Sequence, residues 1–189
     1  MYHLIPISTL LWVACELVLR LRQRRNRGRT VSREWRSLIV IWLCAVLGGV
    51  LAGQLAVHLT ALGIPWLHSA QGIVLALVIA WCGIALRLWS VATLGRFFRP
   101  IVHIQEGHQI VRTGPYRVLR HPAYTGLVVA LFGLTLPLAN VAAIVVVDAL
   151  IVIAVLFRIR VEERALLDGL GEQYAQYMAH TRRLVPGIW

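Results

Sequence analysis

Two polar stretches of the chain carry the residue types that could do chemistry, and the first covers residues 114–126, Gly-Pro-Tyr-Arg-Val-Leu-Arg-His-Pro-Ala-Tyr-Thr-Gly. It lies where a basic connector meets an apolar run. Pro122 suits the first turn of a helix, because its missing N–H would lack a partner there and its φ is already helical. His121 is then the N-cap, beside unpaired N–H groups and a partial positive charge. This helix start suits an anionic, partly aromatic ligand, and the side chains around it are Tyr116, Arg120, His121 and Tyr124.

The second stretch begins at Arg158 and runs to Tyr177. Arg158 and Glu162 are four residues apart and therefore share one face of a helix. Arg158 offers a planar fork for a carboxylate or phosphate, and Glu162 offers an acceptor for an ammonium group or a ribose. The same pair can also be an intrahelical salt bridge at a membrane surface, worth about 0.3–0.5 kcal/mol. The pair alone leaves both readings open.

The composition indicates an integral membrane protein. Hydrophobic residues make up 59% of the 189 residues and charged residues only 14%, with a mean hydropathy of +0.73, whereas soluble proteins average about 25% charged residues. The net charge is +11, but the basic residues collect between apolar runs, so the expected partners are anionic membrane lipids and no nucleic acid. All 19 basic residues are arginines, which excludes Schiff-base lysine chemistry and a P-loop lysine.

Apolar runs of about the length that a bilayer requires predict an all-α, polytopic fold with about five transmembrane helices. These runs cover residues 4–21, 38–62, 71–91, 123–136 and 141–157. Residues 137–140, Pro-Leu-Ala-Asn, are so short a link that spans four and five must form a tight antiparallel hairpin. Residues 158–180 are then expected to form an amphipathic helix at the cytoplasmic surface. Glycines at 48, 49 and 53 predict close helix packing by the second span.

Arginine distribution predicts the orientation of the spans. Residues 20–36 contain eight arginines and one acid, and the positive-inside rule places such a loop in the cytoplasm. The N-terminus is then extracytoplasmic. Arg87, near the end of the third span, marks a return to the cytoplasmic side, where the connector at 96–121 follows. Both polar stretches and the C-terminus are therefore expected at the cytoplasmic face.

Isolated polar residues in the apolar runs have simpler interpretations. Glu16 is expected to face the bundle or to reach the interface, and Asp148 to make a helix-to-helix hydrogen bond rather than a functional contact. Cysteines at 15, 44 and 82 are too far apart in sequence for a metal-type cluster and are expected to be buried thiols. Histidines at 103, 108 and 121 are irregularly spaced, and no metal is predicted.

The two stretches together resemble a known family. The pattern G-P-Y-x-x-x-R-H-P-x-Y-x-G, then an apolar hairpin, then R-x-x-x-E-E-R-x-L-L-x-x-x-G-x-x-Y-x-x-Y-x-x-x-T-x-R is similar to the isoprenylcysteine carboxyl methyltransferases, relatives of the phospholipid N-methyltransferases. The resemblance covers about residues 96–186, and residues 1–95 match only as apolar spans. It implies one membrane-embedded domain over 1–189, with transmembrane helices in 1–95 and the cofactor-binding catalytic part in 96–189.

This resemblance also implies a cofactor and a division of roles. It implies an S-adenosyl-L-methionine pocket at the cytoplasmic face, S-adenosyl-L-homocysteine as product, and a lateral opening for a lipid tail. Arg158 matches the arginine that holds the substrate carboxylate, and Glu163 is expected to face elsewhere. The positions that match the cofactor contacts are His108, Gln109, Ile110, Val111, Tyr116, His121, Pro122, Ala123, Tyr124 and Glu162, with His103 near a further contact.

A carboxylate is already a nucleophile at neutral pH, so methyl esterification requires positioning and exclusion of water rather than a general base. The expected activity is therefore methyl esterification of a prenylated cysteine or similar lipidic acid. Methylation of a phospholipid amine is an alternative, but it would require a base, and no strong candidate stands out. A non-catalytic scaffold that binds anionic lipid through the arginine-rich loop is the other alternative.

Overall fold

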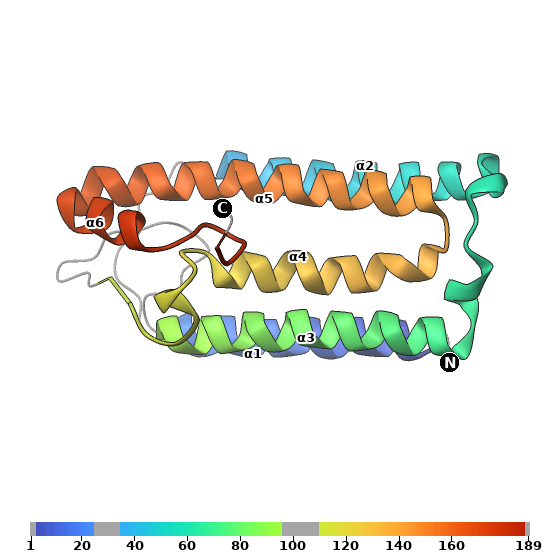
Figure 1. Ribbon diagram of the computed structural model, residues 1–189, viewed down its shortest axis with the longest axis horizontal. Helices are drawn as coiled ribbons and strands as arrows, with labels where there is room; N and C mark the ends of the chain where they lie inside the picture. Colours follow the sequence, from blue (N-terminus) through green and yellow to red (C-terminus); the bar gives the residue numbers. More distant parts are fainter. Residues whose placement is uncertain (1–2, 25–34, 96–109, 188–189) are drawn as a thin grey trace.

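A computed structural model describes residues 3–24, 35–95 and 110–187, and the regular structure in these ranges is helical, as predicted. The long helices lie side by side, and successive ones run in alternating directions (Figure 1). The helices are α1 (Leu4–Arg24), α2 (Trp35–His58), α3 (Ala70–Leu94), α4 (Pro122–Thr135), α5 (Val141–Leu170) and α6 (Glu172–His180), with short 3-10 turns η1 (Thr60–Leu62), η2 (Pro65–His68), η4 (Gly114–Arg117) and η5 (Leu136–Leu138).

Three of these helices are long and apolar enough to cross a membrane: the Ile39–His58 part of α2, Ala70–Leu94 and Val141–Leu170. The apolar parts of α1 and α4 are shorter. The start of α1 and α6 lie at opposite ends of the bundle (Figure 1). The described chain is thus a set of apolar helices with one polar end, where α4 begins and α5 finishes.

Helices α3 and α4 pack backbone to backbone. A Cβ added at Gly83 would lie 2.2 Å from the backbone nitrogen of Ala130, and one at Gly133 would lie 2.4 Å from that of Ala80. These distances leave no room for a side chain, so the two helices can come this close only because glycine occupies both positions. Small residues at helix interfaces are the usual way in which membrane helices gain close contact.

The predicted close packing by the glycines of the second span is wrong for two of the three. Added Cβ atoms at Gly49 and Gly53 would meet nothing within 4 Å, and one at Gly48 would lie 3.7 Å from Leu150 Cδ1, an ordinary contact. A glycine pattern in one helix does not show whether a neighbour lies on that face. Here α2 turns Gly49 and Gly53 outward, and α5 packs beside Gly48.

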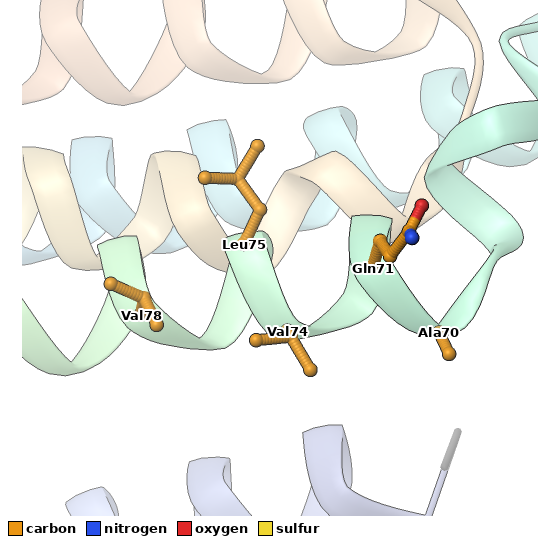
Figure 2. A pocket seen from close by; sticks show the side chains of 5 residues that line it. All are labelled: Ala70, Gln71, Val74, Leu75 and Val78. Carbon is orange, nitrogen blue, oxygen red and sulfur yellow. The ribbon is translucent and has the colours of Figure 1, made fainter.

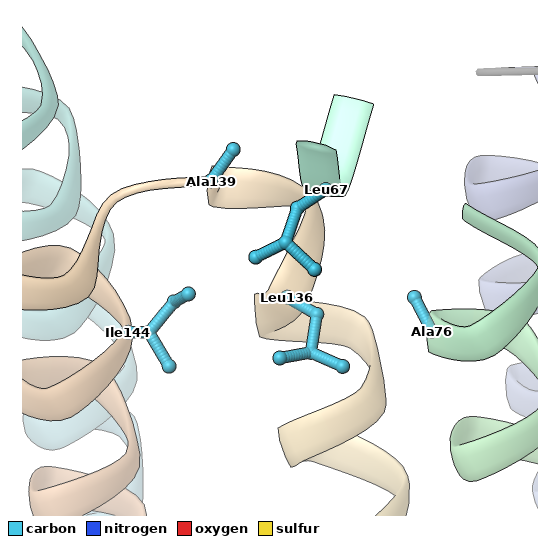
Figure 3. Close-up of a cluster of buried hydrophobic side chains, with 5 residues drawn as sticks. All are labelled: Leu67, Ala76, Leu136, Ala139 and Ile144. Carbon is cyan, nitrogen blue, oxygen red and sulfur yellow. The ribbon is translucent and has the colours of Figure 1, made fainter. Parts of the chain in front are cut away.

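The predicted hairpin between the fourth and fifth spans is confirmed. Asn140 caps α5 by accepting a hydrogen bond from Ala143 N at 3.1 Å, and its amide nitrogen donates to the Leu59 carbonyl oxygen at 2.8 Å. Buried apolar side chains from both arms of the hairpin, η2 and α3 fill this end of the bundle (Figure 3). This cluster is Leu67, Ala76, Leu136, Ala139 and Ile144. It fixes the direction in which α5 returns to the polar end.

The expected boundary at residue 157 is wrong, because α5 continues without interruption to Leu170. No glycine or proline stands between residues 157 and 168, and the segment is rich in good helix formers. Gly171 has φ +52 and ends the helix, and its N–H donates to the Leu167 carbonyl. The segment predicted as one amphipathic helix over 158–180 is therefore the last part of α5 followed by α6.

The outer surface of the bundle is apolar. The outward face of α3 near its start has a shallow groove of about 420 Å³, lined by Ala70, Gln71, Val74, Leu75 and Val78 (Figure 2). This groove lies at the end of α3 away from the polar end, so we assign it to the lipid-facing exterior. Cys15 and Cys82 are also exposed and Cys44 is half-buried. The expected burial of Cys15 and Cys82 is therefore wrong, because those helix faces have no protein neighbour.

Candidate functional site

Pro122 is the first residue of α4 and His121 its N-cap, as the sequence predicts. The imidazole does not cap the helix, however. Its Nε2 lies 3.3 Å from Glu163 Oε1 of α5. The backbone N–H of His121 donates to the Arg183 carbonyl at 3.1 Å. The start of α4 is therefore held by α5 and by the segment that follows α6.

The structure brings Arg158 and Glu162 to Tyr124, across the hairpin. The Tyr124 hydroxyl donates to Glu162 Oε2 at 2.8 Å and accepts from Arg158 Nε at 3.3 Å. Arg158 is only 3% exposed, whereas Glu162 is half-buried. One phenol thus joins the candidate substrate-binding arginine to the candidate cofactor-binding carboxylate.

Glu163 is the centre of a second polar cluster. It is 4% exposed, and three basic side chains surround it. Arg183 Nε donates to its Oε2 at 2.9 Å, while Arg120 Nε and His121 Nε2 lie 3.1 and 3.3 Å from its Oε1. Successive residues of a helix point about 100° apart, so Glu163 reaches the helix start and the chain beyond α6 while Glu162 reaches Tyr124.

Residues 181–184 form a strap, by which we mean the segment after α6 that crosses the start of α4. Arg182 N donates to the Val118 carbonyl at 3.0 Å, and Thr125 Oγ1 donates to the Leu184 carbonyl at 2.8 Å. Leu184 packs against Val155 and Ile159 of α5. Sequence reasoning assigned no role to this strap. The available signal was the end of the second pattern, T-x-R, at Thr181 and Arg183.

Tyr177 attaches α6 to the segment at residues 116–119. The Tyr177 hydroxyl donates to the carbonyl oxygens of Tyr116 and Leu119, at 2.8 and 3.3 Å. Burial raises the pKa of Tyr177 to about 12. Burial also raises the pKa of Tyr116, and the nearby charge of Glu162 raises it further. Both phenols are therefore protonated near neutral pH and can donate hydrogen bonds.

The described part of the site contains groups of the kinds that can contact a nucleoside or a cation. Glu162 supplies an acceptor, and the rings of Tyr116 and Tyr124 supply aromatic faces close to it. Ala123 and Pro122 are buried in the first turn of α4, and Ile110 and Val111 are half-buried. The predicted contacts His103, His108 and Gln109 lie outside the described residues. Within the described ranges, no group of three or more His, Cys, Asp or Glu side chains is arranged to hold a metal ion.

Two further polar contacts complete this description. Asp148 Oδ2 accepts a hydrogen bond from Thr135 Oγ1 at 2.9 Å, so it joins α4 to α5 as expected. Glu16 faces the bundle and is paired with Arg87 of α3. Both pairs lie between helices.

Fold and site together define a helical membrane protein whose polar residues gather where α4 begins and α5 finishes. The profile of the isoprenylcysteine carboxyl methyltransferase family matches residues 74–168, which is half of the chain. The chain belongs to the isoprenylcysteine carboxyl methyltransferase family.

The chain is also similar to individual proteins. A rice protein named a probable protein-S-isoprenylcysteine O-methyltransferase is 30% identical over 125 residues, covering 65% of this chain and 63% of the rice protein. An uncharacterized Bacillus subtilis protein is 34% identical over 98 residues, covering 47% of this chain and 57% of its own. The solved structure of a eukaryotic intramembrane Ras methyltransferase, an isoprenylcysteine carboxyl methyltransferase, superimposes with a TM-score of 0.66 at 25% identity, covering 96% of this chain and 64% of that chain. The matches thus span less than two thirds of these relatives' lengths.

Proposed function

We propose that this protein is a membrane methyltransferase that uses S-adenosyl-L-methionine to esterify the carboxylate of a prenylated cysteine or a similar lipidic acid. The observation that carries the proposal is the Tyr124 hydroxyl, which bonds to both Arg158 and Glu162 at the start of α4. Family membership and the names of the relatives support the same reaction.

Glu162 is the residue that we assign to the cofactor. Bound S-adenosyl-L-methionine supplies an activated methyl group on a sulfonium sulfur. A half-buried carboxylate can accept from the ribose hydroxyls and balance positive charge nearby, while Tyr116 and Tyr124 offer ring faces to the base. The remaining proposed cofactor contacts are His103, His108, Gln109, Ile110, Val111, His121, Pro122 and Ala123.

Arg158 is the residue that we assign to the substrate carboxylate. Its guanidinium lies beside Tyr124, and an arginine fork matches a carboxylate in shape and charge. Because the carboxylate is itself the nucleophile, the chain has to align it with the methyl group and to exclude water. Methylation of a phospholipid amine would also require removal of a proton.

We place this site at the cytoplasmic face, with the N-terminus on the other side of the membrane. The arginines of residues 20–36 support that orientation. In this proposal residues 96–189 bind the cofactor and residues 1–95 supply membrane helices, and membrane lipids surround the whole.

Binding of S-adenosylhomocysteine to the protein in detergent is the first test, followed by methyl transfer to a farnesylated cysteine analogue and to phosphatidylethanolamine. We expect a thermal shift with S-adenosylhomocysteine and transfer to the cysteine analogue. Methyl transfer to phosphatidylethanolamine instead would show that the protein methylates a phospholipid amine. If S-adenosylhomocysteine did not bind, the protein would be better explained as a lipid-binding scaffold.

Two variants separate the assigned roles. Glu162→Ala should raise the Kd for S-adenosylhomocysteine by about tenfold or more, the effect of losing one hydrogen bond to a charged group. Arg158→Ala should reduce turnover while S-adenosylhomocysteine still binds. Glu172→Ala is the control, since this exposed carboxylate of α6 contacts Gln176 on its own helix. Full activity of Arg158→Ala would show that another group holds the substrate carboxylate.

A further inference from the structure

Arg87 of α3 is enclosed in the bundle. It is 7% exposed. Its Nε and Nη2 both donate to the Glu16 carboxylate of α1, the second at 3.2 Å, and its Nη1 donates to the carbonyl oxygen of Ala123 at 3.1 Å. A single side chain therefore connects α1 to the first turn of α4.

Close backbone contact accompanies this hydrogen bond. A Cβ added at Gly126 would lie 2.6 Å from Arg87 N and 2.9 Å from Arg87 Cβ. The first turn of α4 thus rests directly on α3 at Arg87. A shift of the Arg87 backbone therefore has to move the start of α4, because the two backbones are in direct contact there.

This same turn carries Tyr124, whose hydroxyl donates to Glu162. The charge of Arg87 also acts on one phenol of the site. Burial and the Glu162 charge raise the pKa of Tyr116, and Arg87 acts on that phenol in the opposite direction. Arg87 therefore acts on Tyr116 through its charge, and on the turn that carries Tyr124 through its hydrogen bond to Ala123.

The carbonyl oxygen of Ala123 does not need Arg87 as a hydrogen-bond donor. In a regular helix the Ala123 carbonyl already accepts from the N–H four residues later. The donor from Arg87 is additional, and it comes from a guanidinium whose two other polar nitrogens are occupied by Glu16. A buried ion pair adds little net stability compared with apolar packing, but it fixes the direction in which the guanidinium points.

We propose that Glu16 and Arg87 form a positioning pair that sets the place of the first turn of α4 and thereby the affinity for the adenosyl cofactor. The inference rests on the proposed function for its ligand. It gives residues 1–95 a role at the site beyond that of membrane anchors.

Glu16→Gln is the primary test, because it keeps the size of the side chain and removes the charge that holds Arg87. We expect the Kd for S-adenosylhomocysteine to rise about tenfold, as for loss of one buried hydrogen bond to a charged group. Ser8→Ala is the matched control. It removes a second hydrogen bond between α1 and α3, from Trp81 Nε1 to Ser8 Oγ at 3.3 Å, which lies two helix turns further from the site. Equal Kd values for both variants and the unchanged protein would overturn the inference.

An exchanged pair separates positioning from simple helix attachment. Glu16→Arg combined with Arg87→Glu restores an ion pair between α1 and α3, but the carboxylate at position 87 cannot donate to Ala123. We expect the melting temperature to recover relative to Arg87→Gln while cofactor affinity stays weak. If the melting temperature and the cofactor affinity both recovered, the ion pair alone would be sufficient, and the contact with Ala123 would have no effect on affinity.

A measurement without ligand distinguishes failure of this inference from failure of the proposed function. Hydrogen–deuterium exchange of peptides covering residues 122–127 reports on the first turn of α4 directly. We expect faster exchange there in Glu16→Gln and no change in Ser8→Ala. If the unchanged protein fails to bind S-adenosylhomocysteine, the proposed function falls, and the exchange rates still decide whether the pair positions α4.

Discussion

Two adjacent carboxylates of α5 have different surroundings, and this decides which of them a ligand can use. Glu163 is 4% exposed and already has Arg120, His121 and Arg183 around it. A carboxylate with that many basic neighbours balances charge inside the protein. Glu162 is half-buried and accepts from a neutral phenol. Glu162 is therefore the carboxylate suited to an incoming cation or hydroxyl group.

Tyr124→Phe tests the link between the two sides of the site. The substitution keeps the ring and removes the hydroxyl that contacts both Arg158 and Glu162. Loss of a hydrogen bond to a charged group costs about 1.5–3 kcal/mol, so we expect kcat/KM to fall at least about tenfold. Methyl transfer to a farnesylated cysteine analogue measures it. Activity within twofold of the unchanged protein would mean that Arg158 and Glu162 are held in place without this hydroxyl.

Sequence spacing could predict the meeting of Tyr124 with Arg158 and Glu162, because helical periodicity and the short hairpin are local properties. It could not predict the pairing of Glu16 with Arg87, which are 71 residues apart and belong to helices whose relative rotation has no sequence signature. Arg87 was interpreted as a marker of the membrane boundary. Its burial shows that an arginine near a helix end can instead be used inside the bundle.

At the scale of helices, the contact between α3 and α4 is the one that tolerates least change. Gly83→Ala would put a Cβ 2.2 Å from a backbone nitrogen that cannot turn away. We expect a loss of about 1–3 kcal/mol, as for other overpacked sites, and weaker binding of S-adenosylhomocysteine because α4 is displaced. Thermal unfolding in detergent and the binding titration measure both effects.

Gly49→Ala is the control for that prediction. The same methyl group there meets nothing within 4 Å, so stability should be unchanged or should rise by less than about 1 kcal/mol from helix propensity. If Gly83→Ala were tolerated as well as Gly49→Ala, the two helices would have to be further apart than the structure shows.

The attachment of α6 to residues 116–119 should weaken at alkaline pH. The protonated Tyr177 hydroxyl donates to two carbonyl oxygens of residues 116–119, and burial raises the pKa of Tyr177 from 10.0 to about 12. A raised pKa means that the folded state favours the protonated form. The stabilisation is fully present below pH 10 and is lost as the pH rises towards 12. Unfolding temperatures from pH 8 to 12 should therefore fall more steeply for the unchanged protein than for Tyr177→Phe, and parallel curves would contradict this.

Apolar runs predicted the helices and the hairpin well, because membrane helices need long uninterrupted apolar segments. They did not predict where α5 ends. A helix that leaves the membrane changes from apolar to amphipathic without any break in its backbone, so composition marks residue 157 whereas the backbone turns only at Gly171. Glycines are similarly ambiguous, since those of α3 and α4 face a neighbour and two of α2 do not.

At the scale of the whole molecule, the orientation in the membrane is open to a direct test. With Cys15, Cys44 and Cys82 replaced by alanine, single cysteines at the exposed positions Ala61 and Asp168 would mark the two ends of the bundle. Since residues 20–36 carry eight arginines, we expect a membrane-impermeant maleimide to label Ala61→Cys in intact cells and Asp168→Cys only after permeabilisation. The reverse labelling would invert the proposed orientation.

The strap at residues 181–184 has a consequence for biosynthesis. The apolar helices that the structure describes all precede it in the chain, so Arg183 leaves the ribosome after them and only then can reach Glu163. A nascent chain interrupted ahead of Thr181 would have its membrane helices but no residue to cover the start of α4. The start of α4 is therefore covered only late in synthesis, after the helices that meet there have left the ribosome.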